Sequence, residues 1–260
     1  MREASSTDFI RRFRDEPSSS LLLLDFDGTI SAVAPTPEGA VLHPEAHWLL
    51  TRLTSRYRVY VVSGRPAEEL SGLLGLEGVR CLIGLHGLEK LEKGRRSTLR
   101  GAEGYLEAMA EARKEMEGQV RGLEGVTVED KGLIIAVHYR RNPRAAGEVE
   151  GAAARLAAAR GLGLHRGRMV VELRPPLVYG KGRAVEEAVR REGAARALYA
   201  GDDLTDVDAF RSLHRLENEL MGFSALAVAA VSEESPPGLL EECDLAVPGV
   251  EGVIDLLSLL

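Results

Sequence analysis

The chain has 260 residues, 45% of them hydrophobic, which is enough for one large domain or two modest ones with a substantial core. Its formal net charge of -7 at pH 7 argues against nucleic acid as the main partner. The first ten residues lack the features of a secretion signal and no apolar run is long enough to span a membrane, so we expect no membrane partner and a cytoplasmic location. Cys81 and Cys243 lie far apart in apolar stretches, which indicates buried thiols in a reducing compartment.

The first informative motif follows residues 21–24, which are all leucine and predict a strand buried on both faces of a parallel sheet. Residues 25–29 then read Asp-Phe-Asp-Gly-Thr. Ligands of open α/β sheets bind at the carboxyl ends of the strands, so we expect Asp25 and Asp27 at the mouth of an active site. Two carboxylates this close repel each other unless a cation or a shared proton intervenes. Taken alone, the Asp-Gly pair also fits an ordinary turn at a strand end.

Further along the chain, strand-like runs at 59–63, 81–84, 197–201 and 225–231 alternate with helical patterns such as 44–55 and 182–192. This alternation predicts a parallel sheet with right-handed crossovers. Residues 61–65 read Val-Val-Ser-Gly-Arg, so a strand delivers the Ser63 hydroxyl and then a glycine turn. That arrangement suits a phosphate oxygen held by Oγ and backbone N–H groups. Ser-Gly pairs are nevertheless common in loops.

Residues 100–176 depart from this pattern and predict an inserted domain. A helix is expected at 102–121, strands at 126–129 and 133–140, a helix at 142–160, and strands at 162–165 and 169–174. We therefore divide the chain into core segments 1–99 and 177–260 around an insertion of αββαββ order. Apolar and polar residues alternate along its strands, so His138, Arg140 and Glu172 share the face away from the helices. On alternation alone, a plain solvated sheet face is the preferred interpretation.

A lysine flanked by glycines follows the insertion. Lys181 stands between Gly180 and Gly182 just before a helical pattern, where it can approach an anion closely. An exposed lysine in a turn would show the same pattern. The segment is not a Walker loop, because Pro175 occupies the place of the first glycine.

A second strand that ends in acids is the one expected at 197–201. It is followed by Asp202, Asp203 and, four residues after Asp202, by Asp206. Asp202 and Asp206 share a face if a helix begins here. Three carboxylates within five residues are costly to hold together without a cation, and such hard oxygen ligands suit Mg²⁺. An acidic helix N-terminus is the alternative, but it does not explain acids at the ends of two separate strands.

Together these motifs resemble those of the haloacid dehalogenase (HAD) superfamily of phosphohydrolases. Residues 25–29 resemble its first motif, Ser63 its second, Lys181 its third and residues 201–203 its fourth. The resemblance implies an α/β fold, with a Rossmann-like parallel-sheet core and an inserted α+β cap of the C2 type.

Five stretches are similar to the trehalose-6-phosphate phosphatase family in particular. They are Val-Ser-Gly-Arg at 62–65, Gly-Leu-His-Gly-Leu-Glu at 84–89, Val-His-Tyr-Arg at 137–140, Val-Glu-Leu-Arg-Pro at 171–175 and Gly-Asp-Asp-Leu-Thr-Asp-Val-Asp-Ala-Phe at 201–210. The chain departs from the family at Val207, where an acid is frequent, and at Leu85, where the family often has Gly-Glu-His-Gly.

The resemblance implies an enzyme, a Mg²⁺-dependent phosphatase that hydrolyses trehalose 6-phosphate. Asp25 is then the nucleophile that forms an aspartyl-phosphate, and Asp27 protonates the leaving sugar oxygen before it activates water. Mg²⁺ would bind Asp25, the backbone carbonyl of Asp27, and Asp202. Ser63 and Lys181 would hold the phosphoryl oxygens.

Other residues receive supporting roles by the same resemblance. Asp203 and Asp206 are expected to orient the metal waters or Lys181, with Asp203 nearer the chemistry. Arg65 is expected to bond locally or to the cap. The complete set expected to bind substrate is Ser63, Gly64, Arg65, His86, Glu89, Lys131, His138, Arg140 and Glu172.

Three alternatives remain open at this stage. The substrate could be another sugar phosphate, such as sucrose 6-phosphate, a glycosyl-3-phosphoglycerate or a monosaccharide phosphate. The second alternative is a phosphosugar mutase, and the third is a non-catalytic subunit of a trehalose synthase. A trehalose-6-phosphate synthase is the protein partner that the resemblance suggests.

Overall fold

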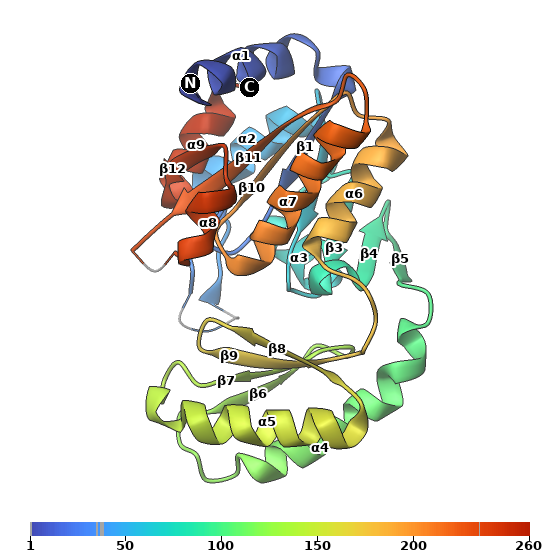
Figure 1. Cartoon of the computed structure of the whole chain (residues 1–260), viewed down its shortest axis with the longest axis vertical. Helices are drawn as coiled ribbons and strands as arrows, with labels where there is room; N and C mark the ends of the chain where they lie inside the picture. Colours follow the sequence, from blue (N-terminus) through green and yellow to red (C-terminus); the bar gives the residue numbers. More distant parts are fainter. Residues whose placement is uncertain (1, 35, 37–38, 234) are drawn as a thin grey trace. The chain divides into compact units, whose positions relative to one another are not determined.

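The computed structural model describes residues 2–34, 36, 39–233 and 235–260, and it has an α/β fold (Figure 1). The chain divides into two compact units. Unit 1 comprises Met1–Ser97 and Tyr179–Leu260, and unit 2 comprises Thr98–Val178. None of the helices in the described part of the chain combines the length and the apolar character that crossing a membrane would need.

Unit 1 contains a sheet of eight strands in its described residues, in the order β12-β11-β10-β1-β2-β3-β4-β5. The strands are β1 (Ser20–Leu24), β2 (Arg58–Val62), β3 (Cys81–Gly84), β4 (Glu89–Glu92), β5 (Arg95–Thr98), β10 (Arg196–Gly201), β11 (Ser224–Val231) and β12 (Leu245–Pro248). The strands from β12 to β3 are parallel, and β4 pairs antiparallel with β3.

The chain leaves the centre of this sheet in two directions. From β1 it passes to β2 and β3 on one side, and after unit 2 it returns to β10 on the other side of β1. The strand order thus reverses between β1 and β10, and open α/β sheets bind their ligands at the carboxyl ends of the strands at such a point.

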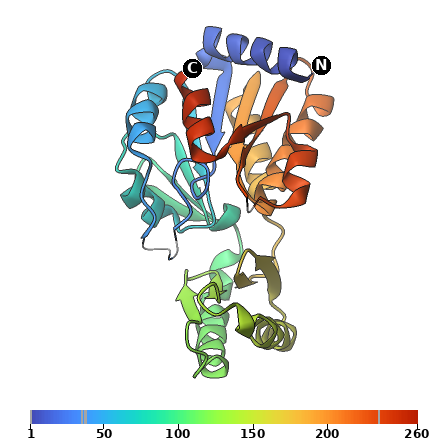
Figure 2. The same cartoon turned by 90° about the vertical axis from the view of Figure 1, so that its left-hand side faces the viewer.

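Helices cover both faces of the sheet (Figure 2). The covering helices are α2 (Pro44–Thr54), α3 (Ala67–Leu74), α6 (Lys181–Glu192), α7 (Leu204–Glu219), α8 (Pro237–Glu242) and α9 (Gly249–Ser258), whereas α1 (Arg2–Asp15) lies across one end of the sheet. Leu22 and Leu24 pack in one core with residues of α2, α3 and α9, whereas Leu21 and Leu23 pack in a second core with α6 and α7. Neighbouring residues of a strand face opposite sides, so burial on both faces requires the unbroken apolar run that the sequence shows.

Unit 2 is an α+β layer with its own core. Strands β6 (Thr127–Asp130), β7 (Ile135–His138), β9 (Val170–Arg174) and β8 (Gly163–Gly167) form an antiparallel sheet in that order. Helices α4 (Leu106–Gln119) and α5 (Ala146–Arg160) supply Met109, Met116 and Leu156 to the core beneath one sheet face. The αββαββ order expected from the sequence is confirmed, with short 3₁₀ turns before each helix.

The elements predicted for the core are also confirmed, and their ends lie within one residue of the predicted ends. The sequence did not indicate the hairpin of β4 and β5, because Lys, Glu and Arg dominate those strands and leave no apolar alternation. The expected strand at 133–140 is shorter in the structure, since Lys131 and Leu133 form a turn before β7 begins.

Candidate active site

The candidate site is built on the carboxyl ends of the central strands of unit 1. The backbone N–H of Asp25 donates to the carbonyl of Ala200 at 2.9 Å, which continues the ladder between β1 and β10 by one residue. Asp25 is buried, whereas Asp27 and Asp202 are partly exposed. Gly28 follows Asp27 with a φ of +78°, a conformation that costs glycine little and other residues more.

Lys181 joins the separate halves of unit 1 at this point. It is the first residue of α6, it is buried, and its Nζ donates to Asp25 Oδ1 and to Asp206 Oδ1, both at 2.7 Å. Burial alone would lower the pKa of Lys181, but the charges of Asp206 and Asp25 outweigh it and raise the pKa. Burial raises the pKa of Asp25 well above its usual value; Lys181 opposes this rise, and Asp206 and Asp202 add to it. The lysine is therefore held as a cation beside the carboxylates.

Asp206 organises the start of α7 as well as Lys181. Its Oδ1 also accepts a hydrogen bond from the Tyr199 hydroxyl, and its Oδ2 accepts from the backbone N–H groups of Asp202 at 3.2 Å and Asp203 at 3.0 Å. Asp203 is the N-cap residue of α7 and forms a capping box with Asp206. Asp206, rather than Asp203, is thus the acid that contacts Lys181.

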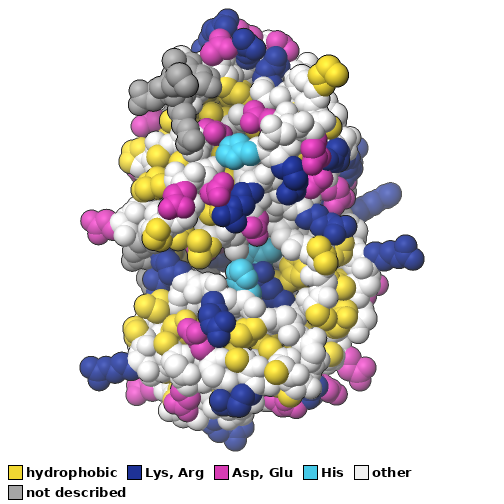
Figure 3. Space-filling model, in the orientation of Figure 1, with side chains coloured by type: hydrophobic (Ala, Val, Ile, Leu, Met, Phe, Trp, Pro, Cys, Tyr) yellow, Lys and Arg dark blue, Asp and Glu magenta, His cyan; other side chains and the backbone are white. Residues whose placement is uncertain are grey.

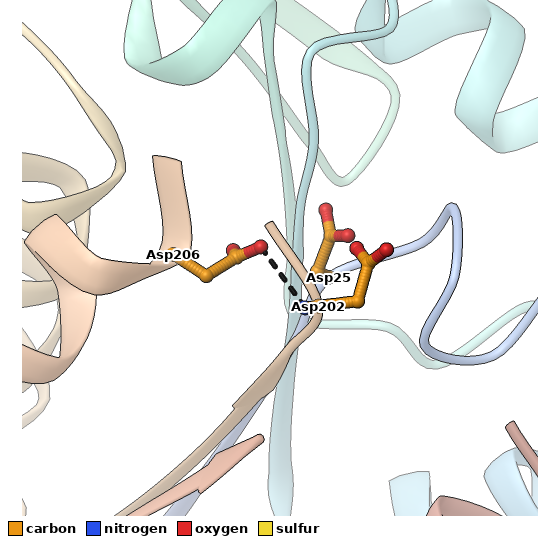
Figure 4. A group of neighbouring side chains, drawn as sticks. All are labelled: Asp25, Asp202 and Asp206. Atoms are coloured by element: carbon orange, nitrogen blue, oxygen red, sulfur yellow. Dashed lines mark hydrogen bonds between the residues drawn. The ribbon is translucent and has the colours of Figure 1, made fainter. Parts of the chain in front are cut away.

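Three carboxylates could hold a cation here. Each of Asp25, Asp202 and Asp206 offers an oxygen within 4.8 Å of the others, and Figure 4 shows the three side chains together. Both oxygens of Asp206 already accept hydrogen bonds, so Asp25 and Asp202 are the better ligands. A Cβ at Gly28 would lie 2.1 Å from Asp202 Oδ2, so this glycine leaves the space that the Asp202 carboxylate occupies. The donor set of hard carboxylate oxygens fits a small divalent cation.

Ser63 directly follows β2 and thus also lies at the carboxyl ends of the central strands. It is buried, its carbonyl accepts from the His86 N–H at 2.9 Å, and its Oγ accepts from the Arg65 N–H at 3.2 Å. Because Oγ accepts this bond, its own hydrogen can be donated to an anion. The His86 ring lies against Gly64, where a Cβ would approach Nε2 to 2.6 Å. Ser63, Gly64 and His86 are therefore brought together.

Arg65 binds the carboxylate of Asp27. Its Nε donates to Asp27 Oδ2 at 2.7 Å and its Nη2 donates to Asp27 Oδ1 at 2.9 Å, while Nη1 contacts Glu69. The expected local bonding of Arg65 is thus with the second acid of the first motif.

Glu89 is placed differently from the other core residues expected to bind substrate. Its carboxylate accepts from the backbone N–H of Ala67 at 2.5 Å and from Arg96 Nε at 2.9 Å, and its side chain is fully buried. It therefore satisfies the first N–H of α3 and pairs with β5.

The residues expected to contact the sugar lie in unit 2, on the sheet face away from α4 and α5. Glu172 pairs across the strands with Ala136, and Lys131 Nζ lies 3.5 Å from its carboxylate. His138 Nε2 lies 2.7 Å from Glu129, and Arg140 follows β7 in a turn. Lys131, His138 and Glu172 form a connected polar cluster, because Lys131 contacts Glu172 and both Lys131 and His138 contact Glu129.

Some members of these networks were missed in the sequence. Arg174 Nε donates to Glu172 at 2.9 Å, and Glu129 contacts both His138 and Lys131. Strand alternation places Arg174 and Glu172 on one face, which was a usable signal. Glu129 becomes their neighbour only through pairing with Ala136. Tyr199 looks like an ordinary apolar strand residue until its contact with Asp206 is seen.

Comparison with known proteins places these motifs in one family. The family model described as trehalose-phosphatase matches residues 23–237. A trehalose-phosphate phosphatase of Mycobacterium avium is 37% identical over 198 residues, which cover 73% of this chain and 50% of that protein. An uncharacterized glycosyl hydrolase of Mycobacterium tuberculosis is 35% identical over 198 residues, only 15% of its length. The chain thus spans half or less of these curated relatives.

Solved structures share the fold over nearly the whole chain. The C-terminal domain of Candida albicans trehalose-6-phosphate phosphatase superposes with a TM-score of 0.79 and 22% identity, over 97% of this chain and 95% of that one. A trehalose-6-phosphate phosphatase related protein superposes with a TM-score of 0.74 and 24% identity, over 92% and 95%. HAD phosphatases are among the structural neighbours. The motifs, the fold and the match over residues 23–237 show that the chain belongs to the trehalose-phosphatase family.

Proposed function

We propose that the protein hydrolyses trehalose 6-phosphate to trehalose and phosphate through an aspartyl-phosphate on Asp25. The observation that carries this proposal is the contact of Asp25 Oδ1 with Lys181 Nζ at 2.7 Å, at the strand end where ligands of such sheets bind. The family match and the phosphatase relatives support the same reaction.

The chain's own residues divide the reaction into two steps. In the first, an Asp25 oxygen bonds to phosphorus, the bond from phosphorus to the sugar oxygen breaks, and Asp27 gives that oxygen a proton. In the second, Asp27 takes a proton from water, which attacks phosphorus and restores Asp25. Lys181 and Ser63 would hold the phosphoryl oxygens. Asp206 would keep Lys181 in place, because it accepts a hydrogen bond from the same Nζ.

We propose Mg²⁺ as the cofactor, held by Asp25, Asp202 and the backbone carbonyl of Asp27. When bound, Mg²⁺ would reduce the repulsion between the carboxylates and the phosphoryl group. The two carboxylates lie close enough to share an ion, and Gly28 leaves them room.

Unit 2 is proposed to be the cap that recognises the sugar. A disaccharide offers many hydroxyls, which acids and bases such as Glu172, Lys131 and Arg140 can bind as acceptors and donors. Glu172 is buried and bonded to Arg174, so its carboxylate is held in a fixed orientation. Within unit 1, His86 and Gly64 are proposed to bind the substrate.

Two further proposals concern the setting of the protein. Cys81 and Cys243 are buried free thiols, the state that a reducing compartment maintains, so we propose a cytoplasmic location. We also propose a trehalose-6-phosphate synthase as partner, which sedimentation of the two purified proteins together would test.

Phosphate release from a panel of esters tests the activity. The panel contains trehalose 6-phosphate, sucrose 6-phosphate, glucose 6-phosphate, mannosyl-3-phosphoglycerate and p-nitrophenyl phosphate, each with Mg²⁺ and with EDTA. We expect a strong preference for trehalose 6-phosphate that EDTA abolishes, and no turnover by Asp25→Asn with the fold retained. If the enzyme prefers another ester, that ester would replace trehalose 6-phosphate as the proposed substrate. Wild-type rates in Asp25→Asn would exclude Asp25 as the nucleophile.

Glu172→Ala tests the sugar site separately. The variant should lose about 10²-fold in kcat/KM for trehalose 6-phosphate, because the sugar is no longer oriented, and little for p-nitrophenyl phosphate. Equal losses in kcat/KM for both esters would show that Glu172 does not recognise the sugar. Glu111→Ala is the matched control, since Glu111 lies on α4 of unit 2 and its carboxylate pairs with Arg160 at 2.7 Å.

A further inference from the structure

The contact between Arg65 and Asp27 has the geometry of a bidentate pair. Nε and Nη2 of one guanidinium each donate to a different oxygen of the carboxylate, at 2.7 and 2.9 Å. The planar fork of arginine matches the carboxylate plane, so this arrangement fixes the rotation of the acid as well as its position. Each oxygen accepts one of these two N–H···O bonds, so an oxygen of the protonated carboxyl group can still donate its proton to the leaving oxygen, and an oxygen of the carboxylate can still accept from water.

The arginine is itself held from several sides. Its backbone N–H donates to Ser63 Oγ at 3.2 Å, and its carbonyl accepts from the Leu85 N–H at 2.9 Å. Its guanidinium lies 5.7 Å from the centre of the ring of Phe26, the residue between the two acids of the first motif in the sequence. The guanidinium also contacts Glu69. The side chain is 10% exposed, whereas that of Asp27 is 36% exposed. A well-anchored, largely buried cation therefore orients a carboxylate that remains accessible.

We propose that Arg65 is the positioning residue of Asp27, and that it aims this carboxyl group at the oxygen that leaves in the first step. This inference rests on the proposed function. It assigns Arg65 to proton transfer through Asp27, rather than to binding the sugar or the phosphate.

The leaving group determines how much the rate depends on the orientation of Asp27. When the bond from phosphorus to oxygen breaks, its electron pair stays on the leaving oxygen. An alcohol or sugar oxygen must receive the Asp27 proton as this happens, whereas p-nitrophenolate departs as a stable anion. A misdirected Asp27 should therefore slow esters of poor leaving groups selectively. The value of kcat/KM reports the steps up to this departure and excludes the later attack of water.

Arg65→Lys tests the proposal with esters that carry no sugar hydroxyls. Lysine keeps the positive charge between Asp27 and Glu69 but cannot form the two-pronged contact. With p-nitrophenyl, phenyl and benzyl phosphate, we expect kcat/KM to fall less than about 3-fold for the first and about 10- to 100-fold for the last. In Arg65→Lys, kcat/KM should thus decrease more steeply with the basicity of the leaving group than it does in the wild type. Asp27→Asn should make this decrease steeper as well.

The control is Arg80→Lys, which alters another arginine of unit 1 that pairs with a carboxylate, that of Glu192 at 3.2 Å. Arg80→Lys should leave the dependence of kcat/KM on leaving-group basicity unchanged. Equal losses of Arg65→Lys on all three esters, or a loss confined to trehalose 6-phosphate, would overturn the positioning role in favour of a structural or sugar-binding one. A wild-type protein that hydrolyses no ester would instead overturn the proposed function, and this inference with it.

Discussion

At the scale of single residues, the site depends on where buried charges find partners. Lys181 and Asp25 are both buried, and each would be costly in isolation, but Lys181 contacts two carboxylates at 2.7 Å. The carboxylate of Asp206 in turn accepts hydrogen bonds from Lys181, from the Tyr199 hydroxyl and from the backbone N–H groups just before α7. Removing one partner from such a network leaves the others unpaired, so the contribution of these residues to stability is linked to their proposed catalytic roles.

Asp206→Asn should therefore destabilise the fold strongly. The amide removes one charge facing Lys181 and introduces an N–H group among donors, so we expect the free energy of unfolding to fall by about 3 kcal/mol. Urea denaturation followed by circular dichroism measures this change. Asp203→Asn is the matched control, because asparagine caps a helix about as well as aspartate, and it should cost less than about 0.5 kcal/mol.

Gly28→Ala should weaken metal binding. A Cβ there would lie 2.1 Å from Asp202 Oδ2 and would displace that carboxylate, so half-maximal activity should need about 10-fold more Mg²⁺. Gly94→Ala separates this effect from backbone strain, since Gly94 also has a positive φ of +72° but has open space around its Cβ position. An unchanged Mg²⁺ requirement in Gly28→Ala would remove Asp202 from the proposed metal ligands.

At the scale of elements, polar side chains tie helix α7 of unit 1 to the sheet. His214 of α7 lies 3.0 Å from Asp244, whose carboxylate also accepts from the Ala227 N–H of β11 at 2.8 Å. The hydrogen bond to Asp244 raises the pKa of His214, although burial opposes it. The pair thus joins α7 to β11 most strongly when the imidazole is protonated.

This pair should make stability depend on pH. A raised pKa in the folded state stabilises the protein fully below the unfolded value of 6.5, and the effect is lost as the pH rises through the folded-state pKa. A double-mutant cycle of His214→Asn and Asp244→Asn, followed by Tm, should show coupling at pH 5.5 that has declined by pH 8.5. Coupling that is equal at both values would mean that the imidazole does not change its charge there.

At the scale of the whole molecule, the two units have separate cores. Unit 1 buries its central strands between two helical layers, and unit 2 packs α4 and α5 on one face of its own sheet. Acidic and basic side chains are interspersed on the molecular face that Figure 3 shows, which agrees with a small-molecule substrate rather than a polyanionic one.

Unit 2 should therefore fold by itself. Its apolar residues, including Val137 and Leu156, are buried within the unit, so the fragment Thr98–Val178 should unfold cooperatively in a thermal scan. Val137→Asp places a charge in that core and should abolish the transition. A fragment that shows no transition would mean that unit 2 needs the rest of the chain.

The sequence by itself determined the parallel core, the αββαββ insertion and the strand ends that carry Asp25, Ser63 and Asp202, because apolar runs, alternation and terminal acids are local patterns. Only the tertiary structure decided the partners of the charged side chains. Arg65 reaches Asp27, and Glu89 reaches Ala67 and Arg96, through contacts between separate strands and turns. Such pairings depend on how strand ends are brought together, which no local pattern encodes. The weakly apolar β4 and β5 were missed for a related reason, since β4 joins the sheet by pairing with β3, and β5 joins it by pairing with β4.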